Sequence, residues 1–182
     1  MRITISGKAG TGKSTVARQL SEKLGLKHYS IGDLMRAMAS ERGISLLELN
    51  RLAETDKSID FELDNKLKEL GKEKDDFVVD GRLTAFFVPH AEVRVFLDAD
   101  DRVREERILK DKRQHEKSKS LRDAISNVKK REESEKKRYK KYYGIDYIDK
   151  KLYNCFVDTT KIPPNEVVGN IIKFIESKKK SL

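Results

Sequence analysis

Residues Gly7-Lys8-Ala9-Gly10-Thr11-Gly12-Lys13-Ser14 have the composition and spacing of a loop that binds phosphate groups. They fit the pattern G-x-x-x-x-G-K-[ST], whose glycines let the backbone fold around an anion with several N–H groups pointing inward. A run with strand-like alternation, residues 2–6, precedes the loop, and a helical pattern starts inside it. The positive end of that helix adds to the attraction for phosphate. We predict that these residues and Thr15 bind the phosphates of a nucleoside triphosphate.

Lys13, Ser14 and Asp80 carry groups that suit a phosphate donor with its metal ion. The Lys13 ammonium can reach the β- and γ-phosphates, and the Ser14 hydroxyl can bind Mg²⁺. Asp80 ends a short β-rich run, residues 77–80, and a carboxylate at that end of a strand can hold Mg²⁺ through water. We predict Mg²⁺ as cofactor, with Ser14 and, through water, Asp80 as its ligands.

Two arginines, one in a predicted helix and one after a predicted strand, are expected near this loop. Arg36 lies one turn into a helix that Ser30 or Asp33 can cap, and Arg82 comes two residues after Asp80. The planar guanidinium offers paired donors that suit phosphate oxygens. Each arginine taken alone is typical of an ordinary surface residue. Together with the loop they indicate a second phosphate group near the donor.

Arg131, Glu135 and Arg138 occur at positions i, i+4 and i+7 of a helical segment, so they share one helix face. This face is typical of a binding surface or of an exposed Arg–Glu pair worth about 0.3–0.5 kcal/mol. The histidines, in contrast, have no acidic partners at metal-ligand spacing and are interpreted as ordinary residues. They are His28, His90 and His115.

The order of the elements predicts an α/β protein. Strand-like runs occur at residues 2–6, 27–30, 77–80, 93–98 and 155–158, and helical spacing at 15–24, 33–42, 46–53, 60–70, 102–110, 121–142 and 165–177. Strands that alternate with helices indicate a parallel sheet covered on both faces. We therefore expect three layers around a five-stranded parallel sheet.

Length and composition exclude several classes of protein. The chain has 182 residues, enough for one domain, and no stretch approaches the roughly 20 apolar residues that span a bilayer. The single cysteine, Cys155, excludes an internal disulfide framework and is expected in the core. We expect a cytoplasmic monomer without a membrane partner. The many Lys and Glu residues are a weak sign of heat adaptation.

The charge is concentrated in one window. Residues 102–141 contain 17 basic and 8 acidic residues, so this window carries the whole net charge of +9. Such a local positive field indicates either an anionic partner or a solvated helix with ion pairs along it. Charge alone leaves both interpretations open.

Four segments, taken in their order along the chain, resemble the motifs of a known protein family. They are the phosphate loop, Ser30-Ile31-Gly32-Asp33-Leu34-Met35-Arg36, Val78-Val79-Asp80-Gly81-Arg82-Leu83, and residues 131–146 with the pattern R-x-x-S-E-x-x-R-Y-x-x-Y-Y-G-I-D. This series resembles the cytidylate kinase family, and in particular its small archaeal-type branch among the P-loop nucleoside-monophosphate kinases. The likeness covers residues 1–175, and the last segment is its specific part. Residues 83–87 depart from the family, which usually has Leu-Ala-Gly-Trp after the arginine.

The resemblance implies transfer of the γ-phosphoryl group of MgATP to CMP or dCMP. Arg36 and Arg82 would then bind the acceptor phosphate, Arg131 and Glu135 the sugar hydroxyls, and Arg138 the phosphates. Arg107 resembles the arginine at the start of the lid that neutralises the transferred group. Lys13, Arg82, Arg107 and Arg138 would be the catalytic residues.

The resemblance also implies one kinase domain over residues 1–182, with a P-loop NTPase fold. Its core would comprise residues 1–35, 75–101 and 150–182. A helical segment at about 36–70 would bind the acceptor, and a mobile lid with the helix after it would occupy about 102–145. Asp60 lies in the acceptor segment, where a carboxylate can accept from the cytosine 4-amino group, so Asp60 is a candidate reader of the base.

Two other functions stay open from the sequence. One is a kinase for another small acceptor, such as AMP, UMP or a metabolite, although Arg36, Arg82 and Arg138 favour an acceptor that already carries phosphate. The other is an RNA- or ribosome-associated NTPase whose basic window binds a polyanion, with binding that weakens steeply in salt. The context of the motifs favours the kinase, so we do not expect a nucleic-acid partner.

Overall fold

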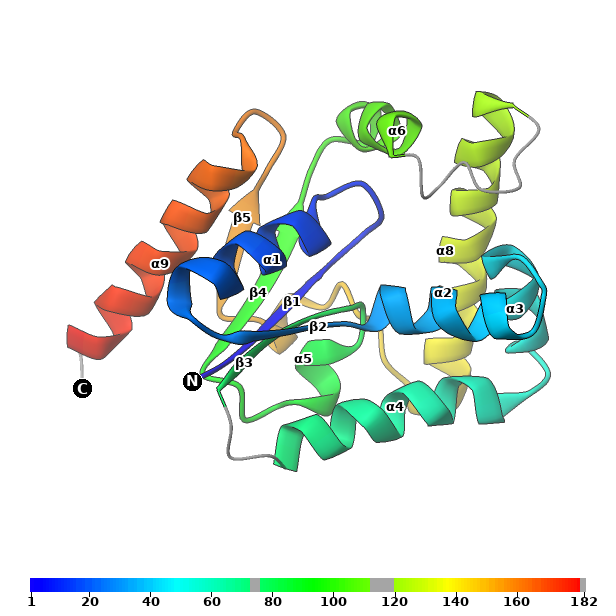
Figure 1. The fold of residues 1–182 in the computed structure, drawn as a ribbon, viewed down its shortest axis with the longest axis horizontal. Coiled ribbons are helices and arrows are strands. Elements are labelled where there is room, and N and C mark those ends of the chain that lie inside the picture. The colour runs from blue at the N-terminus through cyan, green and yellow to red at the C-terminus, as the bar shows by residue number, and fades with distance from the viewer. Residues whose placement is uncertain (73–75, 112–119, 181–182) are drawn as a thin grey trace.

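The computed structural model describes residues 1–72, 76–111 and 120–180. Its centre is a sheet of five parallel strands in the order β2-β3-β1-β4-β5 (Figure 1). The strands are β1 (Arg2–Gly7), β2 (Lys27–Ser30), β3 (Phe77–Asp80), β4 (Val93–Asp98) and β5 (Cys155–Asp158). The predicted α/β class and five-stranded parallel sheet are confirmed.

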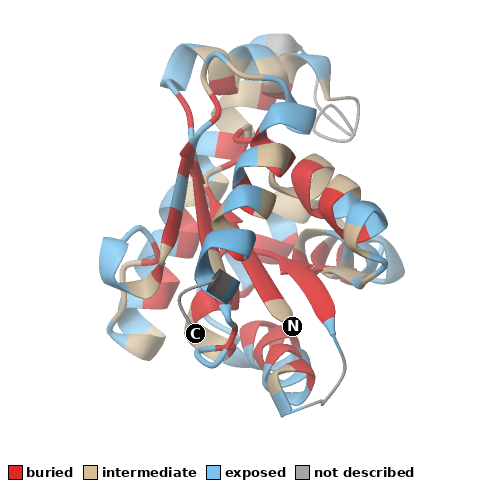
Figure 2. Ribbon diagram, turned by 90° about the vertical axis from the view of Figure 1, so that its left-hand side faces the viewer, coloured by how far each residue is buried: buried red, intermediate tan, exposed pale blue. Residues whose placement is uncertain are grey.

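Helices cover both faces of the sheet. Helices α1 (Lys13–Leu24) and α9 (Pro164–Lys180) contact each other on one face, where their apolar residues form a core with Ile3, Ile5 and the buried Cys155. On the other face, α5 (Thr84–Phe87) brings Ala85 against Phe96 of β4. Figure 2 shows the strands as mostly buried between these layers. The arrangement has the three layers that the sequence predicted.

Three further helices build a second core beside the sheet. They are α2 (Ile31–Glu41), α3 (Leu46–Leu52) and α4 (Lys57–Lys72), and their apolar side chains surround Phe77 and Val79 of β3. Helix α8 (Leu121–Tyr143) contacts α3 and also α6 (Asp101–Lys110). The acceptor segment predicted at about 36–70 therefore consists of α2, α3 and α4.

The predicted elements agree with the structure to within three residues at each end. Within residues 1–72, 76–111 and 120–180, two short helices were not predicted, namely α5 and the 3₁₀ helix at Lys150–Leu152. The predicted lid begins with α6, while residues 112–119 of it lie outside the described residues. Within the described chain, no helix is both long and apolar enough to cross a membrane.

Parallel pairing brings the carboxyl ends of the strands to one edge. Ile5 of β1 lies opposite Asp80 of β3 and Val95 of β4, and Ser30 of β2 also lies opposite Asp80. The phosphate loop follows β1 at this same edge. In sheets of this kind, ligands bind outside the carboxyl ends of the strands. The topology thus assembles the predicted site residues there.

Candidate active site

The phosphate loop has a backbone that only glycine permits at two positions. Gly7 has φ 147°, and a Cβ there would lie 2.3 Å from the Leu97 carbonyl oxygen. Gly10 has φ 78°, and a Cβ there would lie 2.6 Å from the Arg104 carbonyl oxygen. Helix α1 begins at Lys13 without a side-chain cap or an acidic residue in its first turn. Its N-terminal end therefore meets the loop with no competing anion from its own first turn.

A cavity of about 560 Å³ opens next to this loop. One part of its lining comes from residues 9–16 of the loop and α1, with Arg107, Thr159, Ile162, Pro163, Pro164 and Val167. The other part comes from Ile31, Gly32, Met35, Arg36, Leu46, Asp80, Gly81, Arg82, Arg131, Glu135 and Tyr139. The volume falls in the range of small-molecule sites. One cavity thus joins predicted donor residues of the loop to four predicted acceptor residues, Arg36, Arg82, Arg131 and Glu135.

Ser14 and Asp80 lie together as predicted for a metal site. The Ser14 hydroxyl donates a hydrogen bond to Asp80 Oδ2 at 2.9 Å, and the Ser30 hydroxyl donates to the same oxygen at 3.4 Å. A hydroxyl beside a carboxylate is the kind of oxygen donor set that Mg²⁺ prefers when phosphates complete its shell. These residues therefore fit the predicted ion.

His28 also contacts this carboxylate, a partner that its position in the chain did not indicate. Its Nε2 lies 2.8 Å from Asp80 Oδ1. The two residues are 52 positions apart, so spacing along the chain could not reveal them as partners. The pairing of β2 with β3 brings them together. Across the described residues, no group of three or more His, Cys, Asp or Glu side chains forms a metal site.

Lys13 has an altered acidity in this cavity. Its Nζ donates to the Lys8 carbonyl oxygen at 2.7 Å, which folds the side chain over the loop. Burial, together with the positive charge of Arg82, lowers the pKa of Lys13 to about 7. The protein therefore gives the ammonium no full counter-charge, and donor phosphates can supply one.

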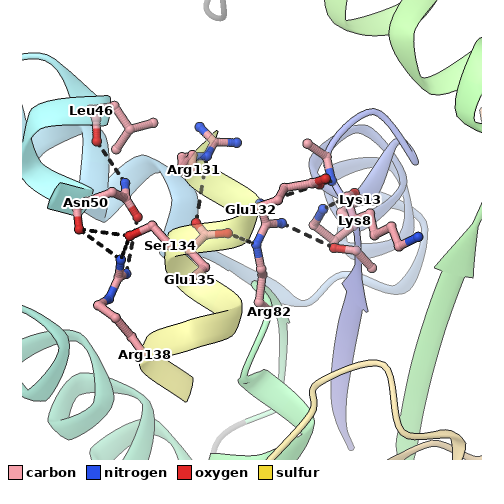
Figure 3. Close-up of polar contacts among 12 residues, drawn as sticks. Lys8, Lys13, Leu46, Asn50, Arg82, Arg131, Glu132, Ser134, Glu135 and Arg138 are labelled. Carbon is pink, nitrogen blue, oxygen red and sulfur yellow. Dashed lines mark hydrogen bonds and ion pairs between the residues drawn. The ribbon is translucent and has the colours of Figure 1, made fainter. Parts of the chain in front are cut away.

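Arg82, Arg131 and Glu135 form a buried group on the acceptor side (Figure 3). Glu135 accepts a hydrogen bond from Arg82 Nε, and its Oε1 lies 3.7 Å from Arg131 Nε. Two nitrogen atoms of the group, Arg82 Nη2 and Arg131 Nε, are buried and have no hydrogen-bond partner. A buried donor without an acceptor costs free energy, so both nitrogens favour a ligand that brings oxygen atoms.

Arg36 and Arg107 line the same cavity, and both guanidinium groups donate hydrogen bonds to neighbouring residues. Arg36 Nη2 donates to Asp33 on its own helix. Arg107 donates from Nη1 to Thr159 Oγ1 at 2.9 Å and from Nη2 to the Thr159 carbonyl oxygen at 2.6 Å. The structure thus places both arginines at the cavity, and their predicted contacts with phosphate stay predictions.

Arg138 and Asp60 are not among the residues that line the cavity. Arg138 donates to Asp60, to Asn50 and to the Ser134 hydroxyl in a buried network between α8, α3 and α4. The structure therefore separates them from Arg131 and Glu135, with which the sequence had grouped Arg138. In this arrangement each is the other's partner, and the contact of Arg138 with phosphate and that of Asp60 with a base stay predictions.

Sequence reasoning missed Arg104, Glu132 and Thr159. Arg104 and Glu132 hold the backbone of Ala9, and Thr159 donates to the Thr11 carbonyl oxygen at 3.1 Å. Arg104 and Glu132 lie in the basic window, among many charged residues of similar type. No spacing pattern distinguishes them from solvated charges.

Residues 2–161 match the model of the cytidylate kinase-like family. The chain belongs to this family. A cytidylate kinase from Natronomonas pharaonis is 43% identical over 168 residues, which are 92% of this chain and 85% of that protein. A cytidylate kinase from Methanocella arvoryzae is 39% identical over 181 residues, which cover 100% of both chains.

Among solved structures, a shikimate kinase from Acinetobacter baumannii in complex with shikimate has a TM-score of 0.60 with this chain. It covers 98% of this chain and 94% of its own, at 18% identity. At that identity the likeness concerns the fold alone. The family member described here thus has the fold of a P-loop kinase, as its sequence predicted.

Proposed function

We propose that this chain is a cytidylate kinase, which transfers the γ-phosphoryl group of ATP to CMP and yields ADP and CDP. The observation that carries the proposal is the single cavity between the phosphate loop and the buried Arg82–Glu135–Arg131 group. Relatives that are named cytidylate kinases and align over most of the chain support the same acceptor.

The donor half of the site would hold ATP by its phosphates. The loop amides and the start of α1 attract the anion, and Lys13 meets the charge that develops on the transferred group. Mg²⁺, held by Ser14 and through water by Asp80, would neutralise phosphate charge when bound. Arg107 would add positive charge from the edge of this half. These groups act by position and charge, which is what phosphoryl transfer chiefly requires.

The acceptor half would hold CMP by its phosphate and its sugar. Arg36 and Arg82 would bind the phosphate, whose own oxygen attacks the γ-phosphorus. Arg131 and Glu135, which both line the cavity, would bind the ribose hydroxyls. Use of dCMP, a monomeric state and a cytoplasmic location belong to the same proposal.

The test is a panel of nucleoside monophosphates with MgATP, followed by ADP release. We expect the highest kcat/KM for CMP, above dCMP, UMP and AMP. A preference for AMP would assign another nucleotide to the same cavity. ATP hydrolysis that no monophosphate stimulates, but that RNA does, would contradict the proposal and favour the polyanion interpretation of the basic window.

A further inference from the structure

The backbone of Ala9 is held from both sides by two charged side chains. Glu132 of α8 accepts the Ala9 N–H through Oε1 at 2.8 Å. Arg104 of α6 donates from Nε to the Ala9 carbonyl oxygen, also at 2.8 Å. Arg104 Nη2 then donates to both oxygens of Glu132, at 2.9 and 3.0 Å. The three residues form a closed ring of hydrogen bonds, which we call the Ala9 clamp.

Packing supports the same position of the loop. The Ala9 side chain forms a small apolar cluster with Ile108 of α6 and Val128 of α8. The neighbouring Gly10 lies so close to α6 that a Cβ on it would be 2.9 Å from the Cα of Arg104. The first half of the phosphate loop thus packs between α6, with which the predicted lid begins, and α8, the helix that follows the lid.

The charges in the clamp are maintained by their surroundings. Arg104 is only 7% exposed. Although burial raises the pKa of Glu132, the charge of Arg82, the Ala9 N–H and Arg104 together lower it below the ordinary value. Removal of Glu132 leaves the buried Arg104 paired with the exposed carboxylate of Asp101, a weaker compensation for its charge. The clamp is therefore a stiff link between the loop and the two helices.

Glu132 is not among the residues that line the cavity. It can act on a ligand through the groups that it holds and through its negative charge, which favours the ammonium form of Lys13 and so raises that pKa. Figure 3 shows Glu132 and Glu135 on the same helix, both turned toward Arg82. Arg82 Nη2 lies 3.8 Å from Glu132 Oε1, while Arg82 Nε donates to Glu135.

We propose that Glu132 is a positioning residue for the phosphate donor, and that it acts with Arg104 through the Ala9 clamp. By fixing the Ala9 peptide, the clamp sets the direction of the loop amides that follow it, from Gly10 onward. Preorganised amides bind phosphate without having to be ordered first, which raises affinity. The inference rests on the proposed function only in that the loop binds the phosphates of a nucleotide donor.

The first experiment compares Glu132→Ala, Glu132→Gln and the control Glu133→Gln. Glu133 is the next residue of α8 and is exposed, so it matches the chemical change without touching the clamp. ADP affinity is measured by titration calorimetry, KM for ATP and for CMP by ADP release, and folding by thermal melting.

Loss of the hydrogen bonds to Glu132 is expected to weaken ADP binding by about tenfold or more in Glu132→Ala, since bonds to charged groups are the strong ones. KM for ATP rises with it, while KM for CMP changes by less than about threefold. Glu132→Gln keeps an oxygen for the Ala9 N–H but not two acceptors for Arg104. Its ADP affinity should therefore lie between those of wild type and Glu132→Ala. Glu133→Gln behaves as wild type.

The second experiment is a double-mutant cycle with Arg104→Ala. Because both residues act on one peptide, the double variant should lose little more ADP affinity than the worse single variant. If the losses of ADP binding free energy in the two single variants add up in the double variant, Glu132 and Arg104 act independently, and the proposal of a shared clamp is wrong. A lower melting temperature with unchanged ADP affinity in Glu132→Gln and Glu132→Ala would make Glu132 structural only. If wild type binds ADP but does not phosphorylate CMP, the proposed acceptor fails, and these affinities still decide the clamp.

Discussion

Arg138 of α8 and Asp60 of α4 form a buried ion pair that joins the acceptor segment to the long helix. Arg138 donates from Nε to Asp60 Oδ2 at 2.7 Å and from Nη2 to Oδ1 at 3.2 Å. Its remaining N–H groups donate to Ser134 and to the backbone and side-chain oxygens of Asn50. All five donors of the guanidinium thus have protein acceptors. Arg138 is 1% and Asp60 4% exposed.

Arg138→Ala is expected to destabilise the protein by about 3–5 kcal/mol, because it leaves the Asp60 carboxylate buried without its partner. Urea unfolding at neutral pH measures the loss. The control is Lys137→Ala, which removes an exposed positive charge at the adjacent position of the same helix. Its free energy of unfolding should stay within about 0.5 kcal/mol of wild type.

The opposite pattern would restore the role that the sequence predicted for Arg138. If Arg138→Ala costs less than about 1 kcal/mol but raises KM for both CMP and dCMP by a large factor, Arg138 leaves Asp60 to bind the acceptor during turnover.

The contacts of Arg138 show which features of this site the sequence could predict and which it could not. Positions 131, 135 and 138 do share a helix face, as their spacing predicted. However, a shared helix face does not give its residues the same neighbours, since Arg138 contacts α3 and α4 while Tyr139, the next residue along the helix, lines the cavity. Arg131 and Glu135 reach the cavity, whereas Arg138 reaches α3 and α4. Periodicity gives the direction of a side chain, and only the tertiary structure gives its partner.

Likewise, the sequence predicts the motifs but not the contacts between residues that lie far apart in the chain. The phosphate loop, the strands and the Ser14–Asp80 pair follow from local patterns and from the parallel order of the strands. The contact of His28 with Asp80 and that of Glu132 with Ala9 join residues 52 and 123 positions apart. Those contacts depend on strand order and helix packing, which a single sequence does not encode as spacing.

Replacement of Lys13 should show its part in the transfer step. Lys13→Ala is expected to lower kcat by several orders of magnitude, since the ammonium meets charge that grows in the transition state. Steady-state rates at saturating ATP and CMP measure the effect. Retention of more than about a tenth of the wild-type rate would remove Lys13 from the catalytic machinery.

The lowered pKa of Lys13 predicts that nucleotide binding takes up a proton. In the free protein this pKa is about 7, and bound phosphates favour the ammonium and raise it. Between the two values the complex holds a proton that the free protein lacks. ADP affinity should therefore fall as the pH rises above about 7, by up to tenfold per pH unit.

Calorimetry at pH 8 in buffers of different ionisation enthalpy measures this uptake. Lys13→Arg is the control, because a guanidinium stays protonated in both states. Equal proton uptake in wild type and Lys13→Arg would assign the proton to another group.

Arg36 offers a test of the acceptor phosphate site, because it lines the cavity and donates a hydrogen bond to Asp33 of its own helix. Arg36→Ala is expected to raise KM for CMP about tenfold or more through loss of a charge-assisted hydrogen bond. KM for ATP should change little. Arg42→Ala serves as control, since Arg42 is exposed at the end of α2 and does not line the cavity. Equal rises in both KM values would place Arg36 outside the acceptor site.

Asp64 predicts a pH dependence of stability. It is 4% exposed, accepts a hydrogen bond from the Tyr143 hydroxyl, and has its pKa raised by burial from 3.8 to about 6. A raised pKa contributes stability that is present below about pH 4 and is lost as the pH rises through about 6. Two units correspond to about 3 kcal/mol. Asp64→Asn should therefore gain stability relative to wild type between pH 4 and pH 7 in urea unfolding, and a constant difference across this range would contradict the assignment.

Glu135 gives a prediction about the sugar of the acceptor. Its carboxylate lines the cavity and is held between Arg82 and Arg131, so it can accept a hydrogen bond from the ribose 2′-hydroxyl. A site that binds a hydroxyl penalises the analogue without it. Glu135→Ala should thus weaken CMP more than dCMP, by on the order of 1 kcal/mol beyond any loss that both share through the released arginines. Glu135→Gln keeps an accepting oxygen and should retain the wild-type ratio of kcat/KM for CMP over dCMP. If Glu135→Ala lowers kcat/KM for CMP and for dCMP by the same factor, Glu135 only holds the two arginines in place, and other residues recognise the ribose.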